Sequence, residues 1–271
     1  MVYADLHMHS SHSEDSDAGM ESMIESSIEK GLKCICFTEH MDMDFPQNEE
    51  GLSFEVDTDE YHSHYLECRE KYAERIKILF GIEYGLQKHL TKRCSEYVNS
   101  YPFDMVIGSS HIVNGKDPYY SMYYEGRSER EAYLEYFESV LENVKLFDDF
   151  DIYGHLDYVV RYGPNKDKFY SYSVYSDILD EILINIIKKG KGIEINTGGL
   201  FCGRCSDTNP CPDIVKRYKE LKGEIITVGA DAHKPDAVGY AFDRAENILK
   251  EAGFEYYCIF ENRRPEFIKL L

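Results

Sequence analysis

Positive charge is scarce in this sequence relative to negative charge. The 271 residues include 30 lysines and arginines against 50 aspartates and glutamates, which gives a formal net charge of −20 at pH 7. This excess argues against nucleic acid or an anionic membrane surface as a partner, because both would be repelled. A small anionic molecule is not excluded, since bound divalent cations would reverse the local field.

Long hydrophobic runs are also missing, although 43% of the residues are hydrophobic. No apolar stretch reaches the ~18 residues that indicate a membrane-spanning helix. The segment before Asp5 and His7 contains neither the basic region nor the apolar region that a signal peptide has in that order. We therefore expect a cytoplasmic protein with no membrane partner.

The eight cysteines do not form a disulfide framework. In a large chain without a signal peptide, reduced thiols are the default. Cys202, Cys205 and Cys211 lie close together in the sequence, but a fourth zinc ligand is not evident and the paired CxxC spacing is absent. The sequence assigns these three cysteines no role.

Short apolar runs alternate with stretches of helical periodicity along the chain. The strand-like runs fall near residues 2–7, 33–38, 76–82, 103–108, 150–154, 191–195 and 225–229, with a short terminal strand near 256–260. The helical stretches fall near residues 18–30, 58–74, 88–100, 128–147, 174–189, 212–222 and 236–252. Seven β-then-α units predict an α/β fold with a parallel sheet closed into a barrel, as one domain over residues 1–271. An open doubly wound sheet is the alternative, but no glycine-rich dinucleotide loop follows the first strand.

The first predicted strand ends in a His-x-His pattern. Side chains two apart on a strand point to the same face, so His7 and His9 project together. Two imidazoles side by side on a rigid strand form half of a metal site. Asp15, on the loop that follows, could add an oxygen ligand to the same cavity.

Most of the other predicted strands also end in residue types that bind metals. These ends are Thr38-Glu39-His40, Gly81-Ile82-Glu83, Ser109-Ser110-His111, Gly154-His155-Leu156-Asp157, Glu194-Ile195-Asn196 and Asp231-Ala232-His233. A lone histidine at a strand end is more often structural, but the ends of a parallel barrel converge on one face, where active sites are built. The pattern therefore predicts a metal-dependent site. His12 is not predicted to be a ligand, and His62 and His64 are expected on the surface of a helix.

These motifs resemble those of the PHP (polymerase and histidinol phosphatase) superfamily, and more closely its histidinol-phosphate phosphatase branch. The resemblance is carried by Asp5–Asp15, Thr38–His40, Gly81–Glu83, Ser109–His111, Gly154–Gly163, Glu194–Thr197 and Gly229–Pro235. It implies a distorted (β/α)7 TIM-like barrel with three divalent metal ions (zinc, iron or manganese) at the C-terminal rim. The implied ligands are His7, His9, Glu83 and Asp231 for one ion, Glu83, His111 and His155 for a second, and Asp15, His40 and His233 for a third. Since the Asp15 position is histidine in some relatives, its oxygen could shift the preference from zinc toward iron or manganese.

The resemblance also implies a reaction. The protein would be a metal-dependent phosphomonoesterase of histidine biosynthesis, in which a metal-bridging hydroxide releases L-histidinol and phosphate from L-histidinol phosphate. Glu83 would bridge two ions, Arg161 and Ser110 would contact the substrate, and Asp231 or His233 would protonate the leaving group. The alternatives are a PHP phosphoesterase for another small phosphate ester or a nucleotide, and a non-catalytic metal-binding protein. The acidic, tyrosine-rich loops at residues 42–58 and 112–128 would select the substrate.

Overall fold

A seven-stranded parallel sheet forms the centre of the molecule. The computed structural model describes residues 2–46, 51 and 53–270. The strands are β1 (Ala4–Met8), β2 (Cys34–Met41), β3 (Lys77–Gly85), β4 (Met105–Ser109), β5 (Ile152–Tyr153), β6 (Gly192–Asn196) and β7 (Ile226–Gly229). They pair in chain order, each parallel to the next. All seven predicted barrel strands are confirmed.

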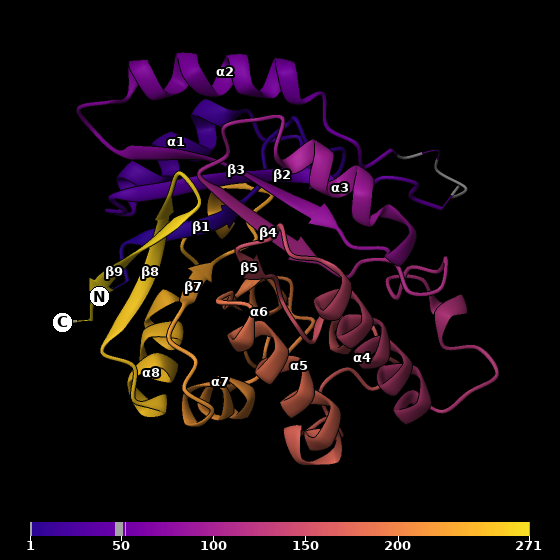
Figure 1. Cartoon of the computed structure of the whole chain (residues 1–271). Helices are drawn as coiled ribbons and strands as arrows, with labels where there is room; N and C mark the ends of the chain where they lie inside the picture. The colour runs from indigo at the N-terminus through magenta and orange to yellow at the C-terminus, as the bar shows by residue number, and fades with distance from the viewer. Residues whose placement is uncertain (1, 47–50, 52, 271) are drawn as a thin grey trace.

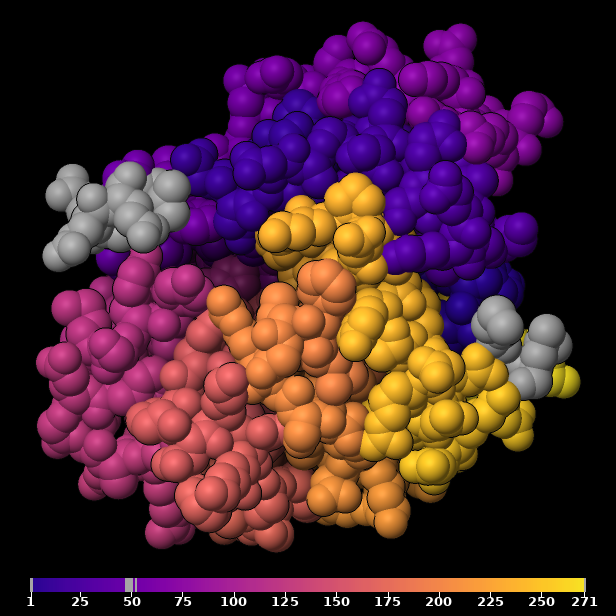
Figure 2. All heavy atoms as spheres, turned by 180° about the vertical axis from the view of Figure 1, so that it is seen from behind, coloured from indigo at the N-terminus to yellow at the C-terminus, as the bar shows by residue number. Residues whose placement is uncertain are grey.

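Backbone contacts between the two outer strands close the sheet into a barrel. The N–H of Asp231 donates to the carbonyl of His7 at 2.7 Å, and the N–H of His9 donates to the carbonyl of Ala232 at 2.9 Å. Met8 and Ala232 also form a parallel bridge. On the face of the molecule shown in Figure 2, gold to yellow atoms from the C-terminal part of the chain lie against indigo atoms from the N-terminal part. The predicted single-domain, TIM-like barrel is confirmed, and the open doubly wound alternative is wrong.

Helices surround the barrel (Figure 1). They are α1 (Met20–Glu29), α2 (Thr58–Lys71), α3 (Thr91–Val98), α4 (Glu129–Leu146), α5 (Ser176–Lys188), α6 (Gly198–Phe201), α7 (Pro212–Glu220) and α8 (Phe242–Ala252). The short helix α6 was not predicted. Helix α8 begins at Phe242 rather than near residue 236, because Gly239 and Ala241 adopt φ angles of 62° and 55°, outside the helical region. In the part of the chain that the structure describes, no helix is long and apolar enough to span a membrane.

An antiparallel hairpin follows the last helix. It consists of β8 (Tyr256–Glu261), which was predicted, and β9 (Arg264–Lys269), which was not. The hairpin lies beside the start of β1, where Tyr3 donates its N–H to the hydroxyl of Tyr257 at 3.4 Å. Most residues of β9 are exposed or half-buried, so its sequence carries little of the hydrophobic alternation that would identify a strand.

The barrel strands are buried on both faces. All eight residues of β2 are buried, as expected for a parallel sheet covered by helices. The buried side chains are mostly apolar, but Glu39, Glu83 and Glu194 are at most 1% exposed and lie toward the carboxyl ends of their strands. Burying a carboxylate costs several kcal/mol unless it is paired and hydrogen-bonded. The three glutamates therefore indicate a candidate functional site at the carboxyl ends of the strands.

Candidate metal centre

The carboxyl ends of the strands meet in one cluster of histidines and carboxylates. The cluster contains all nine predicted metal ligands: His7, His9, Asp15, His40, Glu83, His111, His155, Asp231 and His233. A cavity of about 450 Å³ lies against it. The structure therefore brings together, from seven separate places in the chain, the residues that the strand-end pattern selects.

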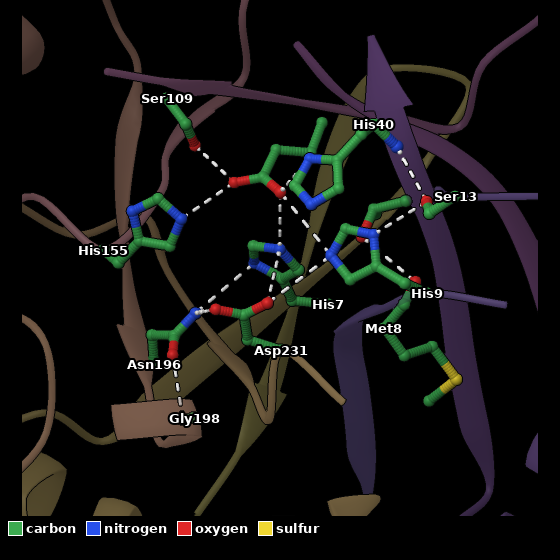
Figure 3. A network of polar contacts seen from close by, with 12 residues as sticks. His7, Met8, His9, Ser13, His40, Ser109, His155, Asn196, Gly198 and Asp231 are labelled. Carbon is green, nitrogen blue, oxygen red and sulfur yellow. Dashed lines mark hydrogen bonds and ion pairs between the residues drawn. The ribbon is translucent and has the colours of Figure 1, made fainter. Parts of the chain in front are cut away.

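Glu83, near the end of β3, lies at the centre of the cluster. The imidazoles within 3.5 Å of its carboxylate belong to His7, His9, His40, His111 and His155. The shortest of these contacts joins Glu83 Oε1 and His155 Nε2 at 2.8 Å, and Ser109 donates its hydroxyl to the same oxygen at 2.6 Å. Figure 3 shows Ser109 and His155 converging from one side of this network while His7, His9 and His40 approach from the other. Because the carboxylate of Glu83 has two oxygens with imidazoles around both, it can bind two cations, one through each oxygen.

Asp231, just beyond β7, faces the two histidines of the His-x-His pattern. Its Oδ1 lies 3.4 Å from His9 Nε2 and 3.6 Å from His7 Nε2 (Figure 3). The hydrogen bond from its backbone N–H to the carbonyl of His7 fixes this position. The hydrogen bond between Asp231 and His7 therefore both closes the barrel and positions the carboxylate of Asp231 in the site.

Asp15 extends the cluster toward the cavity. Its Oδ2 lies 3.1 Å from His233 Nε2 and 3.5 Å from His40 Nε2. The ring of His9 stacks between those of His40 and His233, with centroid separations of 4.3 and 4.2 Å. The loop after β1 therefore places an oxygen donor where the sequence predicts one.

Four of these histidines are anchored through their second ring nitrogen. The contacts are His7 Nδ1 to Glu194 (2.7 Å), His9 Nδ1 to Ser13 (3.2 Å), His111 Nδ1 to Asp42 (3.0 Å) and His233 Nδ1 to the carbonyl of Asp231 (2.9 Å). Such a partner fixes the tautomer and ring orientation and leaves Nε2 for a metal ion. Glu194, Ser13 and Asp42 were not predicted in this supporting role.

Several buried nitrogens in the cluster have no hydrogen-bond partner. They are His9 Nε2, His40 Nδ1, His155 Nδ1 and His233 Nε2. Buried polar atoms are nearly always hydrogen-bonded, so a concentration of unbonded imidazole nitrogens is typical of a site that binds a ligand. Donor atoms within 4.8 Å of one another form the groups His7–His9–Asp231, His7–Glu83–His155, His40–Glu83–His111 and His9–His40–His233. The residues present therefore fit divalent cations held by nitrogen and oxygen.

The local electrostatics favour the metal-binding protonation state at Glu83 and His9, whereas nearby carboxylates outweigh burial and raise the pKa values of His7, His40, His111 and His233. Burial alone would raise the pKa of Glu83, but the charges of His7 and His111 hold that pKa well below its usual range. Burial, together with the neighbouring His233, lowers the pKa of His9 to about 3. At neutral pH Glu83 is therefore an anion and His9 a neutral imidazole, which are the protonation states that a metal requires.

Arg161 lies in the cavity wall beside the cluster. Its guanidinium donates to Asp231 Oδ2 at 2.9 Å, to Asn196 Oδ1 at 2.6 Å and to Asn209 Oδ1 at 2.9 Å. The side chain is almost fully buried, so its position is fixed before any substrate arrives. Asn196 and Asn209 were not predicted, although Asn196 lies in a motif that the sequence singles out.

Ser110 does not reach the cavity. Its hydroxyl bonds with the hydroxyl of Tyr153 at 2.6 Å and accepts from Asn143, a residue of α4, at 2.8 Å. Successive side chains of an extended segment point to opposite sides, so Ser109 faces the cluster and Ser110 faces the surrounding helices. The structure gives no support to Ser110 as a substrate contact.

The cavity wall away from the cluster is mainly aromatic and carries one carboxylate and one guanidinium group. Its residues include Phe45, Phe54, Asp117, Tyr119, Tyr120, Tyr158, Tyr162, Phe201, Cys202 and Arg204. The guanidinium of Arg204 lies over the rings of Tyr119 and Tyr162, at 5.3 and 4.6 Å from their centroids. The predicted loop 112–128 thus contributes to the wall, as does the described part of loop 42–58, of which residues 47–50 and 52 lie outside the described residues. Arg204 was not predicted, since nothing in the sequence distinguishes it from a surface arginine.

Fold and site together define a TIM-like barrel with a candidate polynuclear metal centre at its C-terminal rim. A comparison with protein families matches residues 5–198 to the PHP domain. The chain belongs to the PHP domain family, as the sequence motifs implied.

Proteins that are similar to this chain over nearly its whole length are named histidinol-phosphatase or probable histidinol-phosphatase. A histidinol-phosphatase of Lactococcus lactis is 33% identical over 97% of this chain and 96% of its own length. A protein of Clostridium acetobutylicum described as a probable histidinol-phosphatase is 34% identical over 93% of each chain. The crystal structure of the histidinol phosphate phosphatase from Lactococcus lactis, complexed with zinc, L-histidinol and phosphate, has a TM-score of 0.90 at 32% identity and covers 97% of this chain and 98% of its own. A Listeria monocytogenes structure with a TM-score of 0.77 at 21% identity supports the fold alone.

Proposed function

We propose that this protein is a metal-dependent phosphatase that hydrolyses L-histidinol phosphate to L-histidinol and phosphate. The observation that carries the proposal is the cluster of nine metal-binding side chains around Glu83, next to a cavity that also holds Arg161. The similarity to a Lactococcus lactis protein that binds zinc, L-histidinol and phosphate supports the substrate.

The proposed ligand sets follow the groups of neighbouring donors. One ion would be held by His7, His9, Glu83 and Asp231, a second by Glu83, His111 and His155, and a third by Asp15, His40 and His233. Zinc is the cation found in the Lactococcus lactis structure, and zinc, iron and manganese all suit nitrogen and oxygen donors. When bound, these cations would offset the charge of the phosphoryl group and make a water-derived nucleophile available at neutral pH.

The chain's own residues would complete the reaction. Arg161 offers N–H donors to phosphoryl oxygens, a contact that is stronger when it is charge-assisted. The leaving alkoxide needs a proton, and both Asp231 and His233 line the cavity where it would depart. His233 donates Nδ1–H to the carbonyl of Asp231 in one tautomer, which aims Nε2 toward Asp15 and the cavity. We retain Asp231 and His233 as the two candidates for the general acid.

The direct test is phosphate release from L-histidinol phosphate by the purified protein. A chelator should abolish turnover, and added zinc, manganese or iron should restore it. Mononucleotides should be poor substrates in the same assay, and comparable rates on them would indicate a broader phosphoesterase. Full activity in metal-free protein would overturn the proposal.

Asp117 offers a carboxylate for the ammonium group of the substrate. It lies in the cavity wall, and burial raises its pKa to about 6. Since a carboxyl with a raised pKa becomes charged only above that value, KM for L-histidinol phosphate should rise as the pH falls below about 6. Asp117→Asn should raise KM by ~10–100-fold, the value of a hydrogen bond between charged groups. It should also remove the part of this pH dependence that exceeds the effect of protonating the phosphate ester itself, whose second pKa is about 6.

Two controls accompany the Asp117 variant. A phosphate ester of similar size without an amine should show no change in KM between the wild type and Asp117→Asn. Glu125→Gln changes an exposed carboxylate of the same loop and should leave KM unchanged. Equal losses on both substrates would show that Asp117 shapes the cavity instead of binding the ammonium group.

A further inference from the structure

A second cluster of metal-binding side chains lies outside the candidate centre. Among the described residues, one group of closely spaced donors shares no member with that centre: Glu21, His64 and Cys68, whose donor atoms all lie within 4.8 Å of one another. Glu21 is in the first turn of α1, and His64 and Cys68 are in α2. Figure 1 shows α1 and α2 on the same side of the barrel. The cluster therefore joins two helices that are separate in the sequence.

His64 is the middle residue of this cluster. Its Nε2 lies 3.3 Å from Glu21 Oε2, and its Nδ1 lies 3.0 Å from Nε2 of His12, on the loop after β1. Cys68 follows His64 by four residues, so the two side chains lie on the same face of α2. His64 was expected on the surface, and it is 31% exposed, but its two ring nitrogens both face polar partners. A cation at Nε2 could enter from solvent.

The donor set has the chemistry of a zinc site. Thiolate, imidazole and carboxylate are the three side-chain groups that bind zinc, and three protein ligands leave one position for water. A metal-bound histidine usually hydrogen-bonds through its other ring nitrogen, and His64 would do so to His12. Lys71 approaches Glu21 at 3.7 Å, but through Oε1, so that Oε2 stays directed at His64. The contacts already present are therefore compatible with a bound cation.

We propose that Glu21, His64 and Cys68 form a peripheral site for one zinc-type divalent cation. The bound ion ties α1 to α2. Through His12 it also holds the loop between His9 and Asp15, which carries a residue of the candidate centre. The site is independent of the proposed phosphatase activity, because none of its three ligands belongs to the cluster around Glu83.

Cobalt provides a spectroscopic test on the full chain. Protein expressed in cobalt-supplemented medium should show the near-ultraviolet charge-transfer absorption of a cobalt–thiolate bond. The nine residues of the candidate centre contain no sulfur, so this absorption reports on a cysteine outside that set, and the cysteine variants identify which one. Cys68→Ser should lose the absorption and one equivalent of metal by elemental analysis. Cys202→Ser, which changes the cysteine that lines the cavity, should keep both.

A second variant separates metal binding from folding. Cys68 is buried, whereas Glu21 is half-buried with a side chain that is 45% exposed, so Glu21→Gln should fold normally. The substitution should raise the dissociation constant for the peripheral cobalt more than ~10-fold, since loss of even an outer partner of a metal ligand costs that much. Absence of the thiolate absorption from cobalt-loaded wild type would overturn the proposal, as would its persistence in Cys68→Ser. Loss of phosphatase activity with the absorption retained would count against the proposed function alone.

Discussion

Glu83→Gln is expected to lower kcat on L-histidinol phosphate by at least ~10³-fold, the upper range for loss of one preorganised electrostatic group. The amide has nearly the shape of the carboxylate but carries no charge, and only one of its two terminal atoms can bind a cation. Because the imidazoles of five histidines face this carboxylate, its loss weakens two of the three proposed ligand sets at once. Steady-state kinetics and elemental analysis of the same sample would measure both effects.

Glu194→Gln is the matched control. Glu194 is equally buried and bonds to Nδ1 of His7 at 2.7 Å, but it lies outside every group of neighbouring donors. Removal of such a supporting partner costs ~10–100-fold in activity or metal affinity, clearly less than the loss expected at Glu83. Equal effects of the two substitutions would contradict the central position that we give to Glu83. Circular dichroism would confirm that both variants fold.

The candidate ligands that lie at strand ends could be proposed from the sequence because their places in the chain are predictable. His40, Glu83 and His155 follow or end short apolar runs, and strand order in a closed parallel barrel brings all such ends to one rim. Neither the pairing register nor the loop conformations had to be known for this step. The strand-end pattern and the family resemblance therefore selected nine residues that the structure brings together, even though β5 is only two residues long.

The residues that support the ligands depend on details that spacing does not determine. Ser109 and Ser110 are adjacent and chemically identical, and only the pairing of Gly85 with Ser109 decides which of them faces Glu83. A shift of one residue would exchange their roles. The contact between Glu194 and His7 likewise joins positions far apart in the chain, and a lone glutamate in a strand gives no sign of its partner. For this reason the structure gives no support to the prediction at Ser110.

The cavity wall was the least predictable part of the site. Arg204 reaches it only because the unpredicted helix α6 and the loop after it bring that residue over the rings of Tyr119 and Tyr162. Short helices of this kind have too few residues to show a periodic pattern. The position of the cavity wall therefore depends on loop conformation, whereas the positions of most of the candidate metal ligands depend on the barrel.

Arg161→Met is expected to lower kcat/KM for L-histidinol phosphate by ~10²–10³-fold, the effect of removing one donor to developing negative charge. The same change leaves Oδ1 of Asn209 without its arginine donor, whereas Oδ1 of Asn196 keeps the N–H of Gly198 and Oδ2 of Asp231 keeps the amide of Asn196. Loss of the donor to a buried acceptor costs ~1–3 kcal/mol, so the melting temperature should also fall. Arg161→Lys should restore little of the lost kcat/KM, because one ammonium group cannot reproduce the planar guanidinium that contacts three acceptors.

Inhibition by inorganic phosphate separates the two roles of Arg161. If the guanidinium binds the phosphoryl group, the inhibition constant for phosphate should rise together with the loss of kcat/KM in Arg161→Met. If it only positions Asp231, turnover should fall while phosphate binds as tightly as before. Arg217→Met is the matched control, since that arginine pairs with Asp180 and Glu220 outside the cavity and should leave both constants unchanged. The comparison decides whether the buried guanidinium contributes to substrate binding or only to the geometry of the rim.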